Sequence, residues 1–239
     1  MTKPIALFDI DNTLYEGFSY FGLLKTQVIE GIIDTCVLAD ATTSMQKYKA
    51  GIQDYETTIV ELLDIYANGL RGKRYDVVLE STRRIYRKSM KFFSYAEPTI
   101  DVLRDSHDIA LVTGEPQFAA QAVAEFFGLE SYYCTVYEVK HDKFTGNIKS
   151  YLASRHEKHD AIKHLMHGHR AQNSFAFGDS EGDIEMLRAV QYPICLNCTD
   201  GLRDIATKEH WYLPGLHEVE DLVKELMERS IGALDDNNV

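Results

Sequence analysis

The chain has 239 residues, enough for one large domain or for a core with a smaller companion. Hydrophobic residues make up 45% and charged residues 26%, close to the averages for soluble globular proteins, which excludes a disordered or fibrous chain. Acidic residues outnumber basic ones by 37 to 25, and the net charge of −12 repels nucleic acids and anionic membranes. We therefore expect neither nucleic acid nor a membrane as a partner.

The N-terminus and the cysteines indicate where the protein works. Residues 1–4 lead directly into a short apolar run without a signal-peptide pattern, and no apolar stretch of about 20 residues occurs, so we expect a cytoplasmic protein. Its four cysteines are too few and too scattered for a disulfide framework. Cys195 and Cys198 form a single Cys-x-x-Cys pair, which we interpret as buried, unliganded thiols rather than as a metal or redox site.

The pattern of apolar residues predicts an α/β fold with a helical insertion. A first strand over residues 5–10 is followed by a stretch, residues 17–93, that lacks strand patterns. One helix there is marked by a stripe of apolar residues at helical spacing: Ile59, Leu62, Leu63, Tyr66 and Leu70. We therefore expect two units, a core made of residues 1–16 and 95–239 and a helical domain over residues 17–94.

Beyond the insertion, strands and helices alternate. Strands are expected over 109–113, 132–139, 174–177 and 192–197, and helices over 116–127 and 159–166. Residues 136–148, with His141-Asp142 in the middle, indicate a hairpin. This alternation is typical of a doubly wound, Rossmann-like parallel sheet, whose ligands bind at the carboxyl ends of the strands.

Three of the predicted strands end in residues that suit phosphate chemistry. The first runs into Asp9-x-Asp11-x-Thr13, which by itself fits an acidic helix cap equally well. The second ends in Thr113-Gly114, whose hydroxyl and amide can bind a phosphate. Another ends in Gly178-Asp179 with Asp183 four residues on, a spacing that can turn two carboxylates toward one hard cation.

The order of these motifs resembles the haloacid dehalogenase superfamily of aspartate-nucleophile phosphohydrolases, and is closest to its phosphoserine-phosphatase-like branch. The likeness covers residues 1–16 and 95–215, and includes Phe144-Thr145-Gly146 and a helix that opens with Arg155-His156-Glu157-Lys158. In that branch a helical cap follows the first strand, so the resemblance implies that residues 17–94 are a cap that closes over the site and selects the substrate.

The resemblance also implies a role for each motif residue. Asp9 is the nucleophile, Asp11 the general acid and base, and Thr113, Gly114 and Lys158 bind the phosphate. Lys158 is chosen over Lys149 and Lys163 because it stands at a helix start just after the hairpin. The metal site is assigned to four acids, Asp9, Asp11, Asp179 and Asp183. Their negative charges lie so close together that a Mg²⁺ ion is close to obligatory.

Two positions of this chain differ from true phosphoserine phosphatases. Those enzymes resemble one another in having Gly-Gly-Phe after the residue that matches Thr113, and in carrying an acid that binds the substrate ammonium. This chain has Gly114-Glu115-Pro116 at the first place and Phe18 at the second. A carboxylate of Glu115 at the pocket mouth would disfavour the carboxylate of phosphoserine. Several arginines of the insertion could bind an anionic substrate, but none is singled out as a site residue.

The function expected from the sequence is a Mg²⁺-dependent phosphatase that hydrolyses a small phosphorylated metabolite through a phospho-aspartate. Phosphoserine phosphatase proper and a phosphotransferase with an alcohol acceptor are alternative enzymes. A non-catalytic phosphate-binding protein on the same fold is a third possibility, because fold does not imply function. The intact Asp9, Asp11, Lys158 and Asp179 favour an enzyme. The physiological substrate and the oligomeric state are not predicted.

Overall fold

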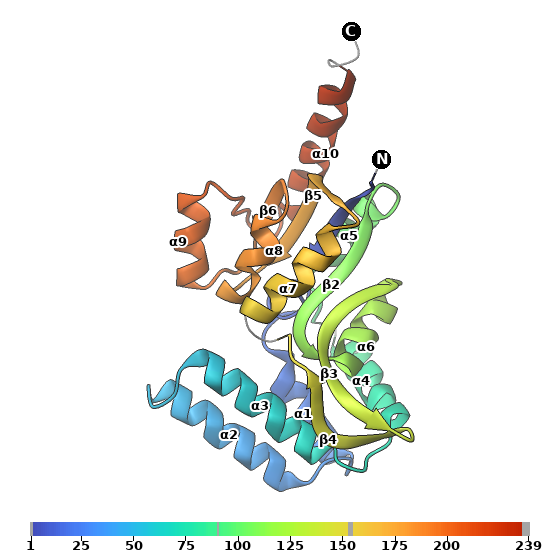
Figure 1. The fold of residues 1–239 in the computed structure, drawn as a ribbon, viewed down its shortest axis with the longest axis vertical. Helices are drawn as coiled ribbons and strands as arrows, with labels where there is room; N and C mark the ends of the chain where they lie inside the picture. The colour runs from blue at the N-terminus through green and yellow to red at the C-terminus, as the bar shows by residue number, and fades with distance from the viewer. Residues whose placement is uncertain (1, 90, 153–154, 236–239) are drawn as a thin grey trace.

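The computed structural model describes residues 2–89, 91–152 and 155–235 (Figure 1). Residue 90 of the expected insertion and residues 153–154 and 236–239 of the expected core lie outside the described residues. A six-stranded sheet in the order β4-β3-β2-β1-β5-β6 forms the centre of the fold. Its strands are β1 (Pro4–Phe8), β2 (Asp108–Pro116), β3 (Ser131–Lys140), β4 (Lys143–Ser150), β5 (Arg170–Gly178) and β6 (Tyr192–Cys195).

Neighbouring strands run parallel except at one edge, where β3 and β4 are antiparallel. The α/β fold is therefore confirmed, with the predicted hairpin as its edge. That hairpin turns at His141 and Asp142, which have φ values of 50° and 62°. Two consecutive positive φ values are what a tight two-residue turn between twisted strands requires.

Alternate residues of the central strands pack into two separate cores, one on each face of the sheet. Ala6 and Phe8 of β1 face the side covered by α5 (Ala96–Arg104), α6 (Gln117–Phe127) and α10 (Val219–Asp235). Ile5 and Leu7 face α7 (Arg155–Met166), α8 (Ile184–Arg188) and α9 (Asp200–Lys208). Burial on both faces explains why β1 is apolar throughout rather than alternating.

The insert after β1 begins with four helices: α1 (Ser19–Ile29), α2 (Thr35–Lys49), α3 (Tyr55–Gly69) and α4 (Tyr75–Ser89). Three residues of the predicted apolar stripe on α3, Leu62, Leu63 and Tyr66, are buried as expected. The insert is fastened to the β3–β4 hairpin, where the amide of Gly72 donates to Phe144 and that of Tyr75 to Asp142. The predicted helical insertion is confirmed.

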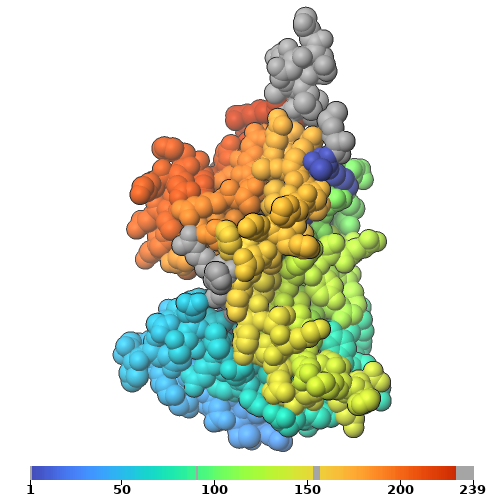
Figure 2. Space-filling view, in the orientation of Figure 1, coloured from blue at the N-terminus to red at the C-terminus, as the bar shows by residue number. Residues whose placement is uncertain are grey.

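The insert lies beyond the carboxyl ends of the parallel strands, whereas both termini lie at the opposite end of the molecule (Figure 1). In the space-filling view the blue and cyan atoms of the insert lie below the orange segment of the core and beside the yellow one (Figure 2). Among the described residues, no helix is long and apolar enough to cross a membrane. The strand ends that carry the motifs therefore lie between the sheet and the insert.

Candidate active site

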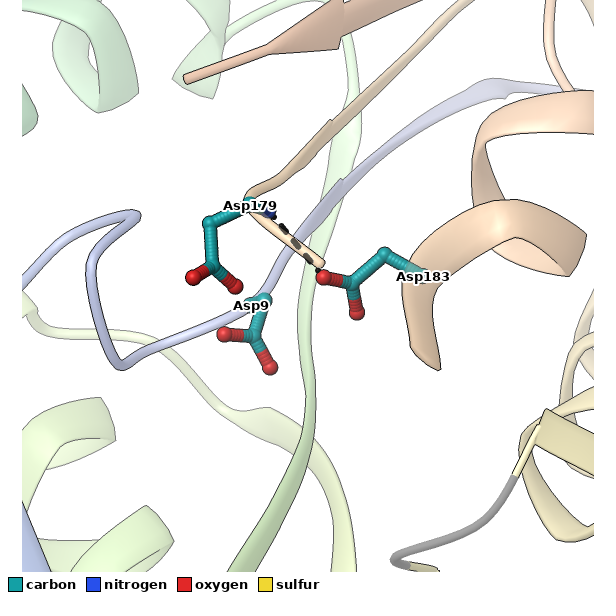
Figure 3. Close-up of side chains that lie close together, drawn as sticks. All are labelled: Asp9, Asp179 and Asp183. Atoms are coloured by element: carbon teal, nitrogen blue, oxygen red, sulfur yellow. Dashed lines mark hydrogen bonds between the residues drawn. The ribbon is translucent and has the colours of Figure 1, made fainter. Parts of the chain in front are cut away.

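Three buried aspartates meet at the carboxyl edge of the sheet (Figure 3). Asp9 follows β1, Asp179 follows β5, and Asp183 lies in the short 3-10 turn η1 (Glu181–Asp183). Because β1 and β5 are parallel neighbours with Phe8 opposite Phe177, the residues that follow them emerge side by side. Each aspartate offers one carboxylate oxygen, and these three oxygens lie within 4.8 Å of one another.

Backbone contacts hold Asp183 in this cluster. Its Oδ2 accepts hydrogen bonds from the amides of Asp179, at 3.1 Å, and Ser180, at 3.3 Å. Its other oxygen, Oδ1, accepts from Nζ of Lys158 at 2.7 Å. Asp183 is fully buried, so its position is fixed by these donors rather than by solvent.

Lys158 is the cation of the site. Its ammonium lies 3.3 Å from Oδ1 of Asp9 and only 5% of the residue is exposed, whereas Lys149 and Lys163 are exposed. Burial disfavours the charged ammonium, but Asp183 and Asp9 outweigh that effect and raise the pKa of Lys158 above its usual value. The structure therefore brings to the aspartates the lysine that the sequence singled out.

The charges of the cluster do not balance. Burial, only partly offset by Lys158, raises the pKa of Asp9 to about 8. Burial and the charges of Asp183 and Asp9 raise the pKa of Asp179 to about 9. Three carboxylates facing one ammonium leave an excess of negative charge, which a divalent cation can neutralise. Carboxylate oxygens are the ligands that Mg²⁺ prefers, so Asp9, Asp179 and Asp183 fit such an ion.

Asp11 lies outside this triad, although the sequence placed it among the metal acids. Its Oδ2 accepts the amide of Ser19 at 3.0 Å, at the start of α1, and its Oδ1 is buried without a hydrogen-bond partner. Burial and the nearby charge of Glu115 raise the pKa of Asp11 well above its usual value. The Asp11 carboxylate is therefore directed to the start of α1 rather than to the triad, and its raised pKa suits an acid catalyst.

The sequence suggested that Glu115 stands at the pocket mouth, but the structure places it elsewhere. Its side chain is buried, only 6% of the residue being exposed, and Oε2 has no hydrogen-bond partner. Burial raises the pKa of Glu115 to about 7. The reason lies in the tertiary packing, because Ser19 and Tyr20, at the start of α1, lie close enough to Glu115 to interact with it.

Thr113 and Gly114 lie near the end of β2, the strand beside β1. Since Phe8 pairs with Leu111, both residues lie beside the chain that carries Asp9. The Thr113 hydroxyl is buried and accepts the amide of Glu115 at 3.3 Å. β2 continues to Pro116, which is the N-cap of α6 rather than its predicted first residue.

Sequence reasoning missed two residues of this region. Asn12, with a φ of 54°, donates from Nδ2 to Oδ2 of Asp179 at 3.1 Å. Its position within the first motif, and the ease with which asparagine adopts positive φ, were the available signals. Tyr55, which begins α3, is 54% exposed, yet partial desolvation of its hydroxyl and the charge of Asp179 raise its pKa to about 12, so the start of α3 lies near the site. Nothing in the sequence distinguishes this tyrosine from the others.

Four of the five arginines of the insert are engaged elsewhere. Arg71 donates to the carbonyl of Thr145, and Arg74 pairs with Asp76. Arg83 pairs with Glu125, and Arg84 with Glu30. These contacts give the four side chains structural partners.

The fold and the acidic site define a class of protein. A model of the haloacid dehalogenase-like hydrolase family matches residues 6–188. The chain therefore belongs to this family, as its motifs predicted.

Several known proteins and solved structures are similar to this chain. A histidinol-phosphatase of Neisseria meningitidis serogroup C (strain 8013) is 24% identical over 223 residues, covering 87% of this chain and 97% of that protein. A protein of unknown function from Bordetella pertussis Tohama I has a TM-score of 0.76 at 22% identity, covering 90% of this chain and all (100%) of that one. A phosphoserine phosphatase solved as a phospho-aspartyl intermediate analogue has a TM-score of 0.58 at 20% identity, covering 87% and 99%. At these identities the structural likeness shows the fold.

Proposed function

We propose that the chain is a Mg²⁺-dependent phosphatase that hydrolyses a small phosphorylated metabolite through a phospho-aspartate on Asp9. The observation that carries this proposal is the position of the Asp9 carboxylate. It lies at a strand end, within 4.8 Å of two further carboxylates and 3.3 Å from an ammonium. Family membership and the name of the Neisseria relative, a histidinol-phosphatase, support the same reaction class.

The first half of the reaction transfers the phosphoryl group to the protein. An oxygen of Asp9 forms a bond to phosphorus while the bond between phosphorus and the leaving oxygen breaks. Asp11, whose raised pKa favours the protonated form, gives its proton to the leaving oxygen. The Thr113 hydroxyl, the Gly114 amide and the Lys158 ammonium would stabilise the charge on the phosphoryl oxygens.

The second half releases phosphate. Asp11, now ionised, takes a proton from a water molecule that attacks the phosphorus, and the bond to Asp9 breaks. A bound Mg²⁺, held by Asp9, Asp179 and Asp183, would supply charge neutralisation that lets one anion approach another. In this proposal residues 17–94 act as the cap whose closure excludes water from the site.

The test is a panel of phosphorylated metabolites assayed for phosphate release with and without Mg²⁺. The proposal expects Mg²⁺-dependent release from at least one small phosphomonoester and none from an Asp9→Asn variant. A stoichiometric phosphoryl adduct on Asp9, detected by mass spectrometry after acid quench, identifies the intermediate. Phosphoryl transfer to added alcohols without phosphate release would favour the phosphotransferase instead. Binding of phosphate without any turnover would favour a non-catalytic protein.

A further inference from the structure

The Cys-x-x-Cys pair has no part in the proposed reaction, yet it adjoins the site. Cys195 ends β6 and is buried, and Cys198, three residues later, is partly exposed. The interaction between the two neighbouring thiols is the main reason why the pKa of Cys195 is raised and that of Cys198 lowered. A more acidic, accessible thiol beside a buried one is the usual arrangement of a reactive cysteine and its resolving partner.

The loop that joins the two cysteines is bonded to the site by its backbone. The amide of Leu196 donates to the carbonyl of Gly178 at 2.9 Å. The amide of Thr199, the residue after Cys198, donates to the carbonyl of Asp179 at 2.9 Å. The loop therefore fixes the end of β5, from which the Asp179 carboxylate projects.

A second path reaches the same carboxylate through a side chain. Asn197, between the two cysteines, donates from Nδ2 to the carbonyl of Asn12 at 2.7 Å. Asn12 in turn donates to Oδ2 of Asp179 at 3.1 Å. Asn197 has a φ of 47°, in the left-handed region that asparagine adopts more readily than most residues.

We propose that Cys195 and Cys198 form a reversible disulfide that displaces this loop and thereby lowers the activity of the site. The proposal rests on the proposed phosphatase function for its effect, but not for the disulfide itself. A disulfide requires a narrow range of Cα separations and a fixed dihedral angle, so closing a ring over three peptide units constrains the loop. Asn197 and Thr199 lie on or beside that ring, and their bonds to Asn12 and Asp179 would shift with it.

The oxidant is a low-molecular-weight disulfide such as oxidised glutathione. The Cys198 thiolate attacks one glutathione sulfur, forming a mixed disulfide and releasing the other half as a thiolate. The Cys195 thiol then loses its proton and attacks the Cys198 sulfur, which releases the second glutathione. One protein dithiol and one glutathione disulfide thus become one protein disulfide and two glutathione thiols. An excess of dithiothreitol reverses the reaction.

The remaining cysteines provide controls. Cys36 is exposed on α2, within the insert, and Cys134 lies on β3 on the other side of the sheet from β6. Neither lies in the loop that is hydrogen-bonded to Asp179. Cys36→Ser is therefore the matched control for Cys198→Ser, since both remove one accessible thiol.

The first measurement follows the disulfide itself in the full-length protein. Incubation with oxidised glutathione should lower the titratable thiols of the unfolded protein from four to two, given its four cysteines, and reduce its mass by two hydrogens. Peptide mapping should place the bond between Cys195 and Cys198. The sole tryptophan, Trp211, precedes Tyr212, whose carbonyl accepts the amide of Cys195 at 2.9 Å, so its fluorescence should change on oxidation. Persistence of four thiols after prolonged oxidation overturns the proposal.

The second measurement follows the effect on the site. Oxidation should lower Mg²⁺ affinity, measured by calorimetry, and lower kcat/KM for the best phosphomonoester at least about tenfold, with recovery in dithiothreitol. Cys198→Ser should keep the activity of the reduced protein and resist oxidation, whereas Cys36→Ser should be inhibited like the wild type. A disulfide that forms without changing Mg²⁺ affinity or activity overturns the regulatory role. A reduced protein without phosphatase activity would defeat the proposed function, while thiol counting and calorimetry would still decide this inference.

Discussion

A Cβ atom on Gly178 would lie 2.5 Å from the Cβ of Asp183. No real pair of such atoms approaches so closely, so only glycine lets η1 fold back against the end of β5. This close approach is what allows Asp183 to accept the amide of Asp179 and to present its other oxygen to Lys158.

Gly178→Ala should therefore displace Asp183 and impair the site. We expect kcat/KM for the best substrate to fall at least about tenfold, equivalent to ~1.4 kcal/mol, with a reduced affinity for Mg²⁺. Gly22→Ala is the matched control, because that glycine is helical and its added methyl would meet nothing within 4 Å. Equal activity of the two variants would contradict the importance of the Gly178–Asp183 contact.

Asp9→Asn should abolish turnover while leaving the fold intact, because the amide keeps the volume of the carboxylate but cannot attack phosphorus. Steady-state kinetics and thermal melting measure the two effects separately. The exposed Asp160 on α7 provides the control, since Asp160→Asn changes the same formal charge away from the cluster. Retention of more than about a tenth of the wild-type kcat by Asp9→Asn would exclude Asp9 as the nucleophile.

Chelation should silence the enzyme, and Mg²⁺ should restore it. Excess Ca²⁺ should inhibit, because it takes six to eight oxygen ligands at longer distances than Mg²⁺ and would spoil the in-line arrangement. The measurement is phosphate release from EDTA-treated protein titrated with each ion. Full turnover by metal-free protein would refute the assignment of Asp9, Asp179 and Asp183 as metal ligands.

The metal-free protein should lose stability as the pH rises. The pKa values of Asp9 and Asp179 are raised to about 8 and about 9 by burial, so between about pH 5 and about pH 9 these groups hold more protons folded than unfolded. The free energy of unfolding then decreases with pH across that interval. Melting curves in EDTA should show this slope, and Asp179→Asn should flatten it. A slope of the opposite sign in the wild type would contradict the raised pKa values.

Phosphoserine should be a poor substrate, with kcat/KM at least about tenfold below the best phosphomonoester of the panel. Phe18 is 42% exposed and stacks on Tyr20, so it offers no charge to a substrate ammonium. Glu115 is buried beside Asp11 and, when ionised, would repel a substrate carboxylate in this region. If phosphoserine proves the best substrate, other residues of the insert must bind its ammonium and carboxylate.

Local patterns in the sequence predicted the strands of the sheet and three of the helices, those near residues 59–70, 116–127 and 159–166, whereas the other helices of the insert and core were not predicted one by one. The ends were less accurate. The first strand was expected to reach Ile10 but ends at Phe8, since the Ile10 carbonyl instead accepts the amides of Leu14 and Tyr15 in the following loop. β5 begins at Arg170, earlier than expected, because the first half of the strand is polar and shows no apolar run.

The sequence by itself determined the order of the motifs, and from it the family and the aspartates that meet at the sheet edge. The residues that follow neighbouring parallel strands lie at the same edge of the sheet. The sequence alone therefore indicated that Asp9 and Asp179 lie close together. Only the tertiary structure decided that Asp11 faces Ser19 and Glu115 beneath α1, and that the loop after Cys195 is bonded to Asp179. Those relationships depend on how distant segments pack and on burial, which a local pattern of residues does not record.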